Sequence, residues 1–394
     1  MKKIKVVDAI CGAGKSTAAI NMINKSDDSK RYLYITPYLD EVERIKQSCP
    51  EKKFYDPKEF GSKLTHIKKL ISEGRNIVST HALFAKFDAD TMELAYLNNY
   101  TLIMDEVADV VYPCDITMSD TKVLLENYVE RNEDGSLTWT DPNYTGRFDD
   151  YKRLCDLGCV YLYSNVNAEQ SLFIWVFPIR VFEAFREVYL LTYLFGAQVQ
   201  KYYYDFYQVE YEFLYVKDFE FTEVPQSYDV SKYKSLITVV ENDKLNMLGE
   251  LDYSFSKSWF TKHKDNAIIS QVKKNTQNFF RNVANSPADK NMWTTFKSLS
   301  PSIQGKGYSK GFVSLNMRAT NQYRGKDTIA YLANRYLNPL IKNFFLTNGV
   351  KVDEDAFALS ELIQFIFRSQ IRDEKPITIY LPSKRMRTIL LNWE

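Results

Sequence analysis

The sequence has few of the residues that build metal sites and disulfide frameworks. It holds three histidines and five cysteines among 394 residues. No two cysteines form a C-x-x-C pair, and the histidines are widely separated (Cys11, Cys49, Cys114, Cys155, Cys159; His66, His81, His263). An odd, dispersed set of cysteines is typical of reduced thiols in a cytosolic protein. We therefore expect neither a zinc centre nor a disulfide scaffold.

The sequence also lacks a long apolar run, a signal-peptide pattern and a strong net charge. No segment reaches the length of a membrane span, and the N-terminus leads directly into a strand pattern. The net charge of +1 excludes a uniformly basic nucleic-acid binder but allows a local basic surface. We therefore expect a cytoplasmic protein with no membrane partner, long enough for two or three domains with a large core.

Near the N-terminus the sequence has a phosphate-binding loop, Ala9-Ile-Cys-Gly-Ala-Gly-Lys-Ser-Thr17. A strand pattern precedes it and a helix pattern follows it, which is the order that a true P-loop needs. The glycines let successive backbone N–H groups point at phosphate oxygens, and the helix adds its positive end. The residues expected to contact the nucleotide are Gly12, Ala13, Gly14, Lys15, Ser16 and Thr17.

An acidic pair further along the chain completes the expected chemistry. The apolar run at 101–104 leads into Asp105 and Glu106. In a P-loop NTPase, Lys15 would reach the β- and γ-phosphates, and Ser16 and Asp105 would hold Mg²⁺. Glu106 would polarise the attacking water. With the P-loop upstream, the pair predicts a nucleotide-hydrolysis site rather than a surface turn.

Short strand patterns alternate with helix patterns through the first third of the chain. Alternation of this kind predicts a parallel sheet covered by helices on both faces. The strands expected in this third lie at 5–8, 32–36, 76–79 and 101–104. A polar, acidic stretch from Glu130 to Asp150 predicts a solvated insertion, placed at about 107–170.

A second α/β unit is expected to begin near Tyr228. Its expected strands lie at 235–240, 267–269, 311–315 and 378–381, with a closing helix over 382–391. No internal repeat and no low-complexity tail is apparent in the sequence. We therefore expect an α/β protein with one domain at 1–225 and a second at 226–394.

The motifs resemble those of superfamily 2 helicases, in order along nearly the whole chain. The P-loop form A-x-x-G-x-G-K-[ST], with Ala9 at its first position, is typical of that superfamily. Later matches follow strands or lie in the last third of the chain, at Thr36-Pro37, Thr80-His81, Thr192, Thr320 and Gln364-x-x-x-Arg368-x-x-x-Arg372. The resemblance is weak at Thr192, and Arg372 comes one residue later than in the family pattern.

The resemblance implies two RecA-like parallel-sheet domains with the nucleotide in the interdomain cleft. It assigns nucleic-acid contacts to Thr36, Pro37, Thr80, His81 and Thr320. It also assigns catalytic roles to Gln364, Arg368 and Arg372, with Arg368 as an arginine finger supplied by the second domain. Positions four apart lie on one face of a helix, so Arg368 and Arg372 are expected to share a face.

A basic segment supports a nucleic-acid partner. From Lys257 to Arg324 there are twelve Lys and Arg but only two acidic residues, Asp265 and Asp289. The segment includes Lys273 and Lys274, and tryptophans, phenylalanines and a tyrosine are interleaved with the basic residues. Basic side chains neutralise phosphates and aromatic side chains stack on unpaired bases. For any single aromatic residue, however, a place in the core is the more common explanation.

Together these features predict an ATP-dependent nucleic-acid translocase or helicase that uses ATP and Mg²⁺. The expected partner is DNA rather than RNA, with replication or recombination proteins beside it. The compact size resembles phage- or virus-encoded helicases, which would place the protein in the host cytoplasm. Two other functions stay open: a P-loop kinase or other small-molecule phosphotransferase, and a nucleic-acid-binding clamp without motor activity.

Overall fold

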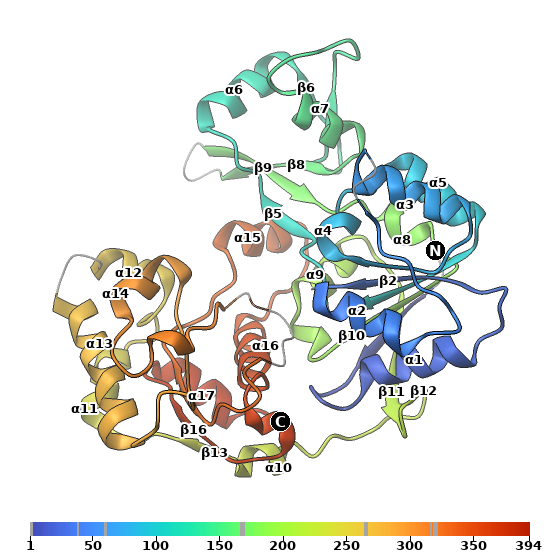
Figure 1. The fold of residues 1–394 in the computed structure, drawn as a ribbon. Helices are drawn as coiled ribbons and strands as arrows, with labels where there is room; N and C mark the ends of the chain where they lie inside the picture. The colour runs from blue at the N-terminus through green and yellow to red at the C-terminus, as the bar shows by residue number, and fades with distance from the viewer. Residues whose placement is uncertain are drawn as a thin grey trace. The chain divides into compact units, whose positions relative to one another are not determined.

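Two mainly parallel sheets organise the computed structural model, which describes residues 3–37, 39–58, 61–165, 170–263, 267–315, 317 and 322–394. The chain divides into two compact units (Figure 1). Unit 1 comprises Met1–Ala9, Ala13–Gln226 and Asn338–Val352; unit 2 comprises Ile10–Gly12, Ser227–Leu337 and Asp353–Glu394. The α/β class expected from the sequence is confirmed.

The sheet of unit 1 has seven strands in the order β12-β11-β1-β10-β4-β2-β3. Their bounds are β1 Ile4–Asp8, β2 Arg31–Thr36, β3 Ile77–Thr80, β4 Tyr100–Asp105, β10 Glu187–Thr192, β11 Tyr211–Lys217 and β12 Glu220–Thr222. Every neighbouring pair is parallel except β11 and β12. The four strands expected in the first third of the chain are all present, to within a residue or two at their ends.

The strand register brings three carboxyl ends together in the middle of this sheet. Asp8 of β1 pairs with Thr192 of β10, and Leu191 of β10 pairs with Asp105 of β4. In open sheets of parallel strands, ligands bind outside the carboxyl ends. The P-loop and the Asp-Glu pair, which are far apart in the sequence, therefore lie at one edge.

Helices follow the strands of this sheet and bury one apolar face each. They are α1 Lys15–Lys25, α2 Leu39–Ser48, α3 Lys63–Ser72, α4 His81–Phe84, α5 Ala89–Leu97, α8 Arg180–Glu183 and α9 Val199–Phe206. Local capping sets where two of them begin, since Ser62 Oγ accepts the Thr65 N–H at 3.0 Å and Asp88 Oδ1 accepts the Thr91 N–H at 3.0 Å. None of the helices in the described residues is long and apolar enough to span a membrane.

The insertion between β4 and β10 is a folded subdomain rather than a solvated excursion. Its elements are β5 Val111–Pro113, α6 Met118–Asn127, β6 Val129–Arg131, β7 Leu137–Trp139, α7 Asp149–Asp156, β8 Val160–Asn165 and β9 Gln170–Val176. Leu124, Leu137, Trp139 and Phe173 belong to its own buried core. The expectation of a solvated stretch at 130–150 is therefore wrong: its polar residues are surface positions of turns, two short strands and the start of α7, and its few apolar residues lie in the core of the subdomain.

The sheet of unit 2 has four parallel strands in the order β13-β16-β15-β14. Its strands are β13 Ile237–Val239, β14 Asn291–Thr294, β15 Thr328–Tyr331 and β16 Ile377–Tyr380. Its helices are α10 Val230–Ser235, α11 Asp243–Asn246, α12 Lys257–His263, α13 Ala267–Asn278, α14 Ser300–Ile303, α16 Glu354–Ile366 and α17 Lys384–Leu391. The strands expected near 235–240 and 378–381 and the closing helix are confirmed.

Two strands expected in unit 2 are absent from its described residues. The apolar run at 267–269 is the first turn of α13, because a short apolar run is equally compatible with a buried helix. The run at 311–315 forms no strand, and only Phe312 makes an isolated bridge, to Trp293. The strands that do fill the sheet, β14 and β15, are four residues each and carry polar residues at their ends, so periodicity did not reveal them.

A helix from the last third of the chain packs with unit 1. Helix α15 spans Pro339–Thr347 within the segment 338–352. Its Phe344 ring lies 5.8 Å from Tyr161 and 5.2 Å from Phe206, and its Phe345 ring lies 5.8 Å from Tyr202. The chain thus leaves unit 2 after Leu337, contributes an apolar face to unit 1 and returns at Asp353, an excursion that the sequence did not reveal.

Candidate nucleotide-binding site

The phosphate loop has the backbone conformation that its glycines predict. Gly12 and Gly14 have φ of 90° and 86°, a region that only glycine adopts without strain. Gly14 is also the N-cap of α1, and no side chain caps that helix end. The positive end of α1 therefore lies at the phosphate loop, as in helix N-termini that bind phosphate.

Asp105, at the end of β4, is the polar centre of the site. Its Oδ2 accepts hydrogen bonds from Ser16 Oγ and from Tyr34 OH, both at 3.0 Å. The carboxylate is 9 % exposed. The structure thus joins the P-loop hydroxyl to the acidic residue expected to share Mg²⁺ with it. Tyr34, on β2, is a site residue that sequence reasoning missed, because a buried tyrosine in a strand looks like any core residue.

The Asp105 carboxylate has neutral donors around it and little compensating charge. Burial raises the pKa of Asp105 above its ordinary value, although the hydrogen bonds from Ser16 and Tyr34 oppose this. Arg44 acts on it only from a distance and is itself engaged with Glu41, its Nε lying 2.7 Å from the Glu41 carboxylate. A buried carboxylate in this state is stabilised by a cation, so the site is electrostatically prepared for one.

The donor set fits Mg²⁺ rather than a transition metal. In the part of the chain that the structure describes, no group of three or more His, Cys, Asp or Glu side chains could hold a metal ion. Mg²⁺ is typically bound by one or two protein oxygens, with water and substrate phosphates completing its shell. Ser16 Oγ and Asp105 Oδ2, 3.0 Å apart, offer just such a pair of hard oxygens.

Glu106 has a strained backbone. Its φ is 72°, a left-handed conformation that costs a non-glycine residue free energy, of order 1–3 kcal/mol where such strain is stored. Its N–H donates to Leu191 O at 2.9 Å, which fixes the turn after β4 against the end of β10. The turn places Glu106 directly after the buried Asp105, and its side chain is partly exposed. Strain of this kind recurs at functional sites, which agrees with the role expected for Glu106.

Lys15 contacts the loop that it belongs to. Its Nζ donates to Ala9 O at 2.6 Å, and the side chain is 8 % exposed. The ammonium group is therefore held at the mouth of the loop by a backbone carbonyl. A bound phosphate oxygen could accept a hydrogen bond from this ammonium group in place of the Ala9 carbonyl oxygen, without any movement of Ala9.

Asp8 is a second site residue that the sequence did not single out. Its two carboxylate oxygens accept the Leu194 N–H at 2.9 Å and the Phe195 N–H at 3.0 Å. Burial raises the pKa of Asp8, while these hydrogen bonds and the charge of Lys15 oppose the shift. Asp8 thus ties the strand that precedes the P-loop to the turn that follows β10, where Leu194 has a left-handed φ of 54°. The sequence feature that could have identified Asp8 is its position directly before the P-loop.

The expected nucleic-acid contacts in unit 1 differ in their exposure. Thr36 is fully buried, and its hydroxyl has no hydrogen-bond partner among the described residues. Pro37, Thr80 and His81 are partly exposed at the ends of β2 and β3. His81 Nε2 lies 3.1 Å from Asp105 O, which links this edge of the sheet to the Asp-Glu turn. Thr320 lies outside the described residues.

The aromatic residues of the basic segment belong to the core of unit 2. Trp259, Phe260, Phe279, Phe280, Trp293 and Tyr308 are at most 5 % exposed and pack in one cluster, with Phe296 partly buried beside it. Stacking of bases on these rings is therefore excluded in this conformation. Lys273 is partly exposed and Lys274 exposed on α13, so these basic side chains reach solvent, while the aromatic residues take the core positions that were the more common explanation for each of them.

The last predicted motif does not form one helix. Helix α16 ends at Ile366, and Arg372 lies in a separate 3-10 turn at Gln370–Asp373. Ser369 is extended, and its hydroxyl donates to Ile366 O at 2.6 Å, which ends the helix. The expectation that Arg368 and Arg372 share a helical face is therefore wrong. Gln364 is partly buried in α16, and Arg368 is 6 % exposed with its guanidinium 5.3 Å from the centre of the Phe365 ring.

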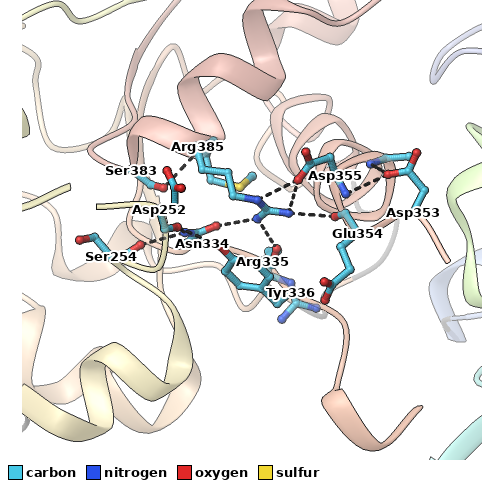
Figure 2. A network of polar contacts seen from close by, with 12 residues as sticks. Asp252, Ser254, Asn334, Arg335, Tyr336, Asp353, Glu354, Asp355, Ser383 and Arg385 are labelled. Atoms are coloured by element: carbon cyan, nitrogen blue, oxygen red, sulfur yellow. Dashed lines mark hydrogen bonds and ion pairs between the residues drawn. The ribbon is translucent and has the colours of Figure 1, made fainter. Parts of the chain in front are cut away.

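A different arginine, Arg385, lies at the centre of a polar network in unit 2 (Figure 2). Figure 2 shows the Arg385 guanidinium enclosed by groups from both limbs of the α15 excursion. It donates to Asn334 Oδ1 and Arg335 O, both at 2.8 Å, on the outgoing limb. On the returning limb it donates to Glu354 O at 3.1 Å and to Asp355 Oδ1 at 2.8 Å. One side chain of α17 thus ties together the two points where the chain leaves unit 2 and re-enters it.

Family models match two parts of the chain. The YonV middle domain matches residues 111–175, which is the folded insertion, and the YonV C-terminal Rossmann-like domain matches residues 231–394. The fold is similar to that of Xpd4 from S. tokodaii, with a TM-score of 0.50 and 11 % identity over 99 % of this chain and 94 % of that one. It is similar to an apo XPD structure as well, with a TM-score of 0.51 and 11 % identity over 98 % and 94 %.

These structural likenesses are at the level of the fold, an α/β architecture with two RecA-like domains. In sequence, the chain is 41 % identical over 413 residues to the "SPbeta prophage-derived uncharacterized protein YonV" of Bacillus subtilis (strain 168). That alignment covers 100 % of this chain and 99 % of the relative. With such identity over its full length, the chain belongs to the YonV family.

Proposed function

We propose that this protein is an ATP-dependent motor that translocates on nucleic acid or remodels it, DNA rather than RNA, in the cytoplasm of a phage-carrying host. The observation that carries the proposal is the hydrogen bond of Ser16 to Asp105 at the mouth of the P-loop. It brings together the residues that a P-loop NTPase uses for Mg²⁺. The prophage origin of the relative and the likeness in fold to XPD proteins agree with a phage helicase acting in replication or recombination.

Each residue of the site has a role in this proposal. Gly12, Gly14 and the first turn of α1 cradle the phosphates, and Lys15 moves from Ala9 O to the terminal phosphates. Ser16 and Asp105 hold Mg²⁺, which neutralises charge on the phosphates when bound. Glu106 orients the attacking water.

The roles of the remaining candidates rest on the resemblance to superfamily 2 helicases. Arg368 stabilises the charge of the transition state as an arginine finger, and Gln364 and Arg372 support it. Lys273 and Lys274 attract the polymer through its phosphates.

The test is the rate of ATP hydrolysis measured with no polymer, single-stranded DNA, duplex DNA and RNA. We expect stimulation by DNA in the wild type and none in Lys15→Ala. Reversing charge at Lys273 and Lys274 should raise the polymer concentration needed for half-maximal stimulation and flatten its salt dependence, with the basal rate retained. Charge reversal at Lys69 and Lys122, which are exposed and outside the basic segment, is the matched control.

Two outcomes would replace the proposal. In the first, no polymer stimulates ATP hydrolysis, and charge reversal at Lys273 and Lys274 changes neither polymer binding nor its salt dependence. The proposed function would then be that of a small-molecule phosphotransferase. If the chain binds DNA but hydrolyses no nucleotide, it is a clamp.

A further inference from the structure

An exposed aromatic side chain lies beside the phosphate loop, on the hairpin formed by β11 and β12. Lys217 pairs with Glu220, so Asp218 and Phe219 form the two-residue turn. Both have left-handed backbone conformations, with φ of 52° and 58°. Turns of this type favour Asn-Gly, and a phenylalanine at such a position is an outlier. This backbone conformation is strained for a non-glycine residue, which suggests that the Phe219 ring has a function at this position.

The Phe219 ring lies directly on Gly14 of the phosphate loop. A Cβ atom added to Gly14 would lie 2.6 Å from Phe219 Cδ1 and 2.8 Å from Cε1, so the ring occupies the space that any other residue would need. Phe219 is nevertheless 55 % exposed. One part of the ring therefore packs on the loop and much of the rest faces solvent.

Helix α1 itself holds the turn in this position. Asn21 Nδ2 donates to Phe219 O at 3.1 Å, and Lys25 forms an ion pair with Glu220. Asn21 and Lys25 are four residues apart and share one face of α1. The ring is thus fixed relative to the helix whose N-terminus receives the phosphates.

We propose that Phe219 is the platform on which the base of the bound nucleotide stacks. The strand order β12-β11-β1-β10-β4 places the hairpin and Asp105 on opposite sides of β1. A nucleotide with its terminal phosphates and Mg²⁺ at Ser16 and Asp105 has its base at the far end of the molecule, on the hairpin side. This inference rests on the proposed nucleotide site and adds the group that recognises the base.

The chemistry of the platform predicts which nucleotides it accepts. Every base has a π-face, and stacking on an aromatic ring discriminates little between them. The polar side chains that reach the turn, Asn21 and Lys25, are engaged in holding it. The ligand is therefore a nucleoside triphosphate of any base, bound more tightly when the base is a purine with its larger stacking surface.

The experiment compares Mg²⁺ complexes of ATP, GTP, UTP and inorganic tripolyphosphate by calorimetry on the full chain. In the wild type, the two purine nucleotides should bind more tightly than UTP, and UTP more tightly than tripolyphosphate. Phe219→Ala should weaken the binding of ATP and of GTP by about tenfold, which is within the range that base–aromatic stacking contributes. It should change tripolyphosphate affinity by less than about twofold, because the phosphate contacts are unchanged. Phe219→Trp should retain ATP affinity, and its fluorescence should be quenched by ATP and not by tripolyphosphate.

Phe213→Ala is the matched control, because Phe213 is an exposed aromatic of the same hairpin and is 42 % exposed. It should leave all four affinities unchanged. Equal weakening of ATP and tripolyphosphate by Phe219→Ala would show that the ring only shapes the loop, and no weakening of either would show that the base lies elsewhere. Wild-type protein that binds tripolyphosphate as tightly as ATP would overturn this inference alone, whereas wild-type protein that binds neither would overturn the nucleotide site as well.

Discussion

Asp105 in unit 1 is buried and the Arg385 side chain in unit 2 is only 11 % exposed, and these two charged groups differ in how well their charge is balanced. In unit 1, Asp105 receives bonds from two neutral hydroxyls, and its pKa is raised by burial. In unit 2, Arg385 meets the Asp355 carboxylate, an amide oxygen and two carbonyl oxygens, and its guanidinium lies 4.1 Å from the centre of the Tyr336 ring.

This difference separates a group kept for chemistry from a group kept for structure. A buried charge without a compensating partner destabilises the fold, so its presence indicates a ligand that supplies the missing charge. A guanidinium whose donors all meet acceptors has nothing left to offer a ligand and holds the chain in place. We therefore propose a functional role for Asp105 and a structural role for Arg385, and the predictions below test that division.

Removal of Lys15 should have the largest effect on activity. Lys15→Ala loses the ammonium proposed to contact the terminal phosphates, and nucleotide turnover should be abolished. The side chain lies in a ligand-facing loop and donates to Ala9 O of that same loop, so the midpoint of urea unfolding should stay close to that of the wild type. A folded mutant with normal turnover would remove the nucleotide site from unit 1.

Arg368 tests whether the last motif acts in chemistry. If Arg368 is the arginine finger, Arg368→Ala should lower DNA-stimulated hydrolysis by about 10³-fold, while ATP affinity stays within several-fold. Its burial against Phe365 allows a second outcome. A mutant that unfolds at lower urea and hydrolyses ATP normally when folded would place Arg368 with Arg385 among the structural arginines.

Replacement of Arg385 should lower stability and leave activity unchanged, which is the opposite of the result expected for Lys15. Arg385→Ala leaves Arg335 O, Glu354 O and Asn334 Oδ1 without this donor, so the free energy of unfolding should fall by about 2–4 kcal/mol. Urea denaturation measures this loss, and hydrolysis by the folded fraction should be normal at low temperature. Lys384→Ala, on the same helix and exposed, is the control and should change stability by less than about 0.5 kcal/mol. Equal stability of both variants would contradict the role of Arg385.

The same contrast explains which parts of the molecule could be predicted from sequence. The P-loop, Asp105 and Glu106 are local patterns, and the strands that carry them were found because apolar runs end in them. The partners Tyr34 and Asp8 were missed because their role depends on which strands are neighbours in the sheet. The Arg385 network joins 334–335 to 354–355 through a third segment, and no local pattern records such a contact.

Unit 2 was harder to predict than unit 1 for a related reason. The aromatic residues among its lysines are buried on α12, in the π-helical turn Phe279–Val283 that follows α13, and on β14, so the sequence alone could not separate a base-stacking role from a core position. The helix predicted to carry Arg368 and Arg372 ends early because Ser369 satisfies the backbone in an extended conformation. The burial of the aromatic residues is set by tertiary packing, whereas the early end of the helix is set by a local hydrogen bond from Ser369 to Ile366 O.

When no cation is bound, the buried Asp105 carboxylate should lower the free energy of unfolding at neutral pH. Its folded pKa is raised, so its protonated form favours the fold, and this contribution is lost as the pH rises from the ordinary value of about 4 through the raised pKa. Asp105→Asn should therefore raise the free energy of unfolding by about 1 kcal/mol at neutral pH without nucleotide, and by less near pH 4. It should also abolish the dependence of nucleotide binding on Mg²⁺. A less stable mutant at neutral pH would show that the carboxylate is compensated in the native state.

The smallest effect should be a selective reaction at Cys11. Burial raises the pKa of Cys49 to about 11 and that of Cys114, Cys155 and Cys159 to about 12, so these thiols are almost wholly protonated at pH 8. Cys11 is partly exposed in the phosphate loop, and a maleimide or disulfide reagent should modify it first. Because Cys11 directly precedes Gly12, Mg²⁺ and ATP should slow this reaction several-fold in the wild type and not in Lys15→Ala, as measured by mass spectrometry of the labelled peptide. Protection that persists in Lys15→Ala would mean that the nucleotide shields Cys11 from somewhere other than the phosphate loop.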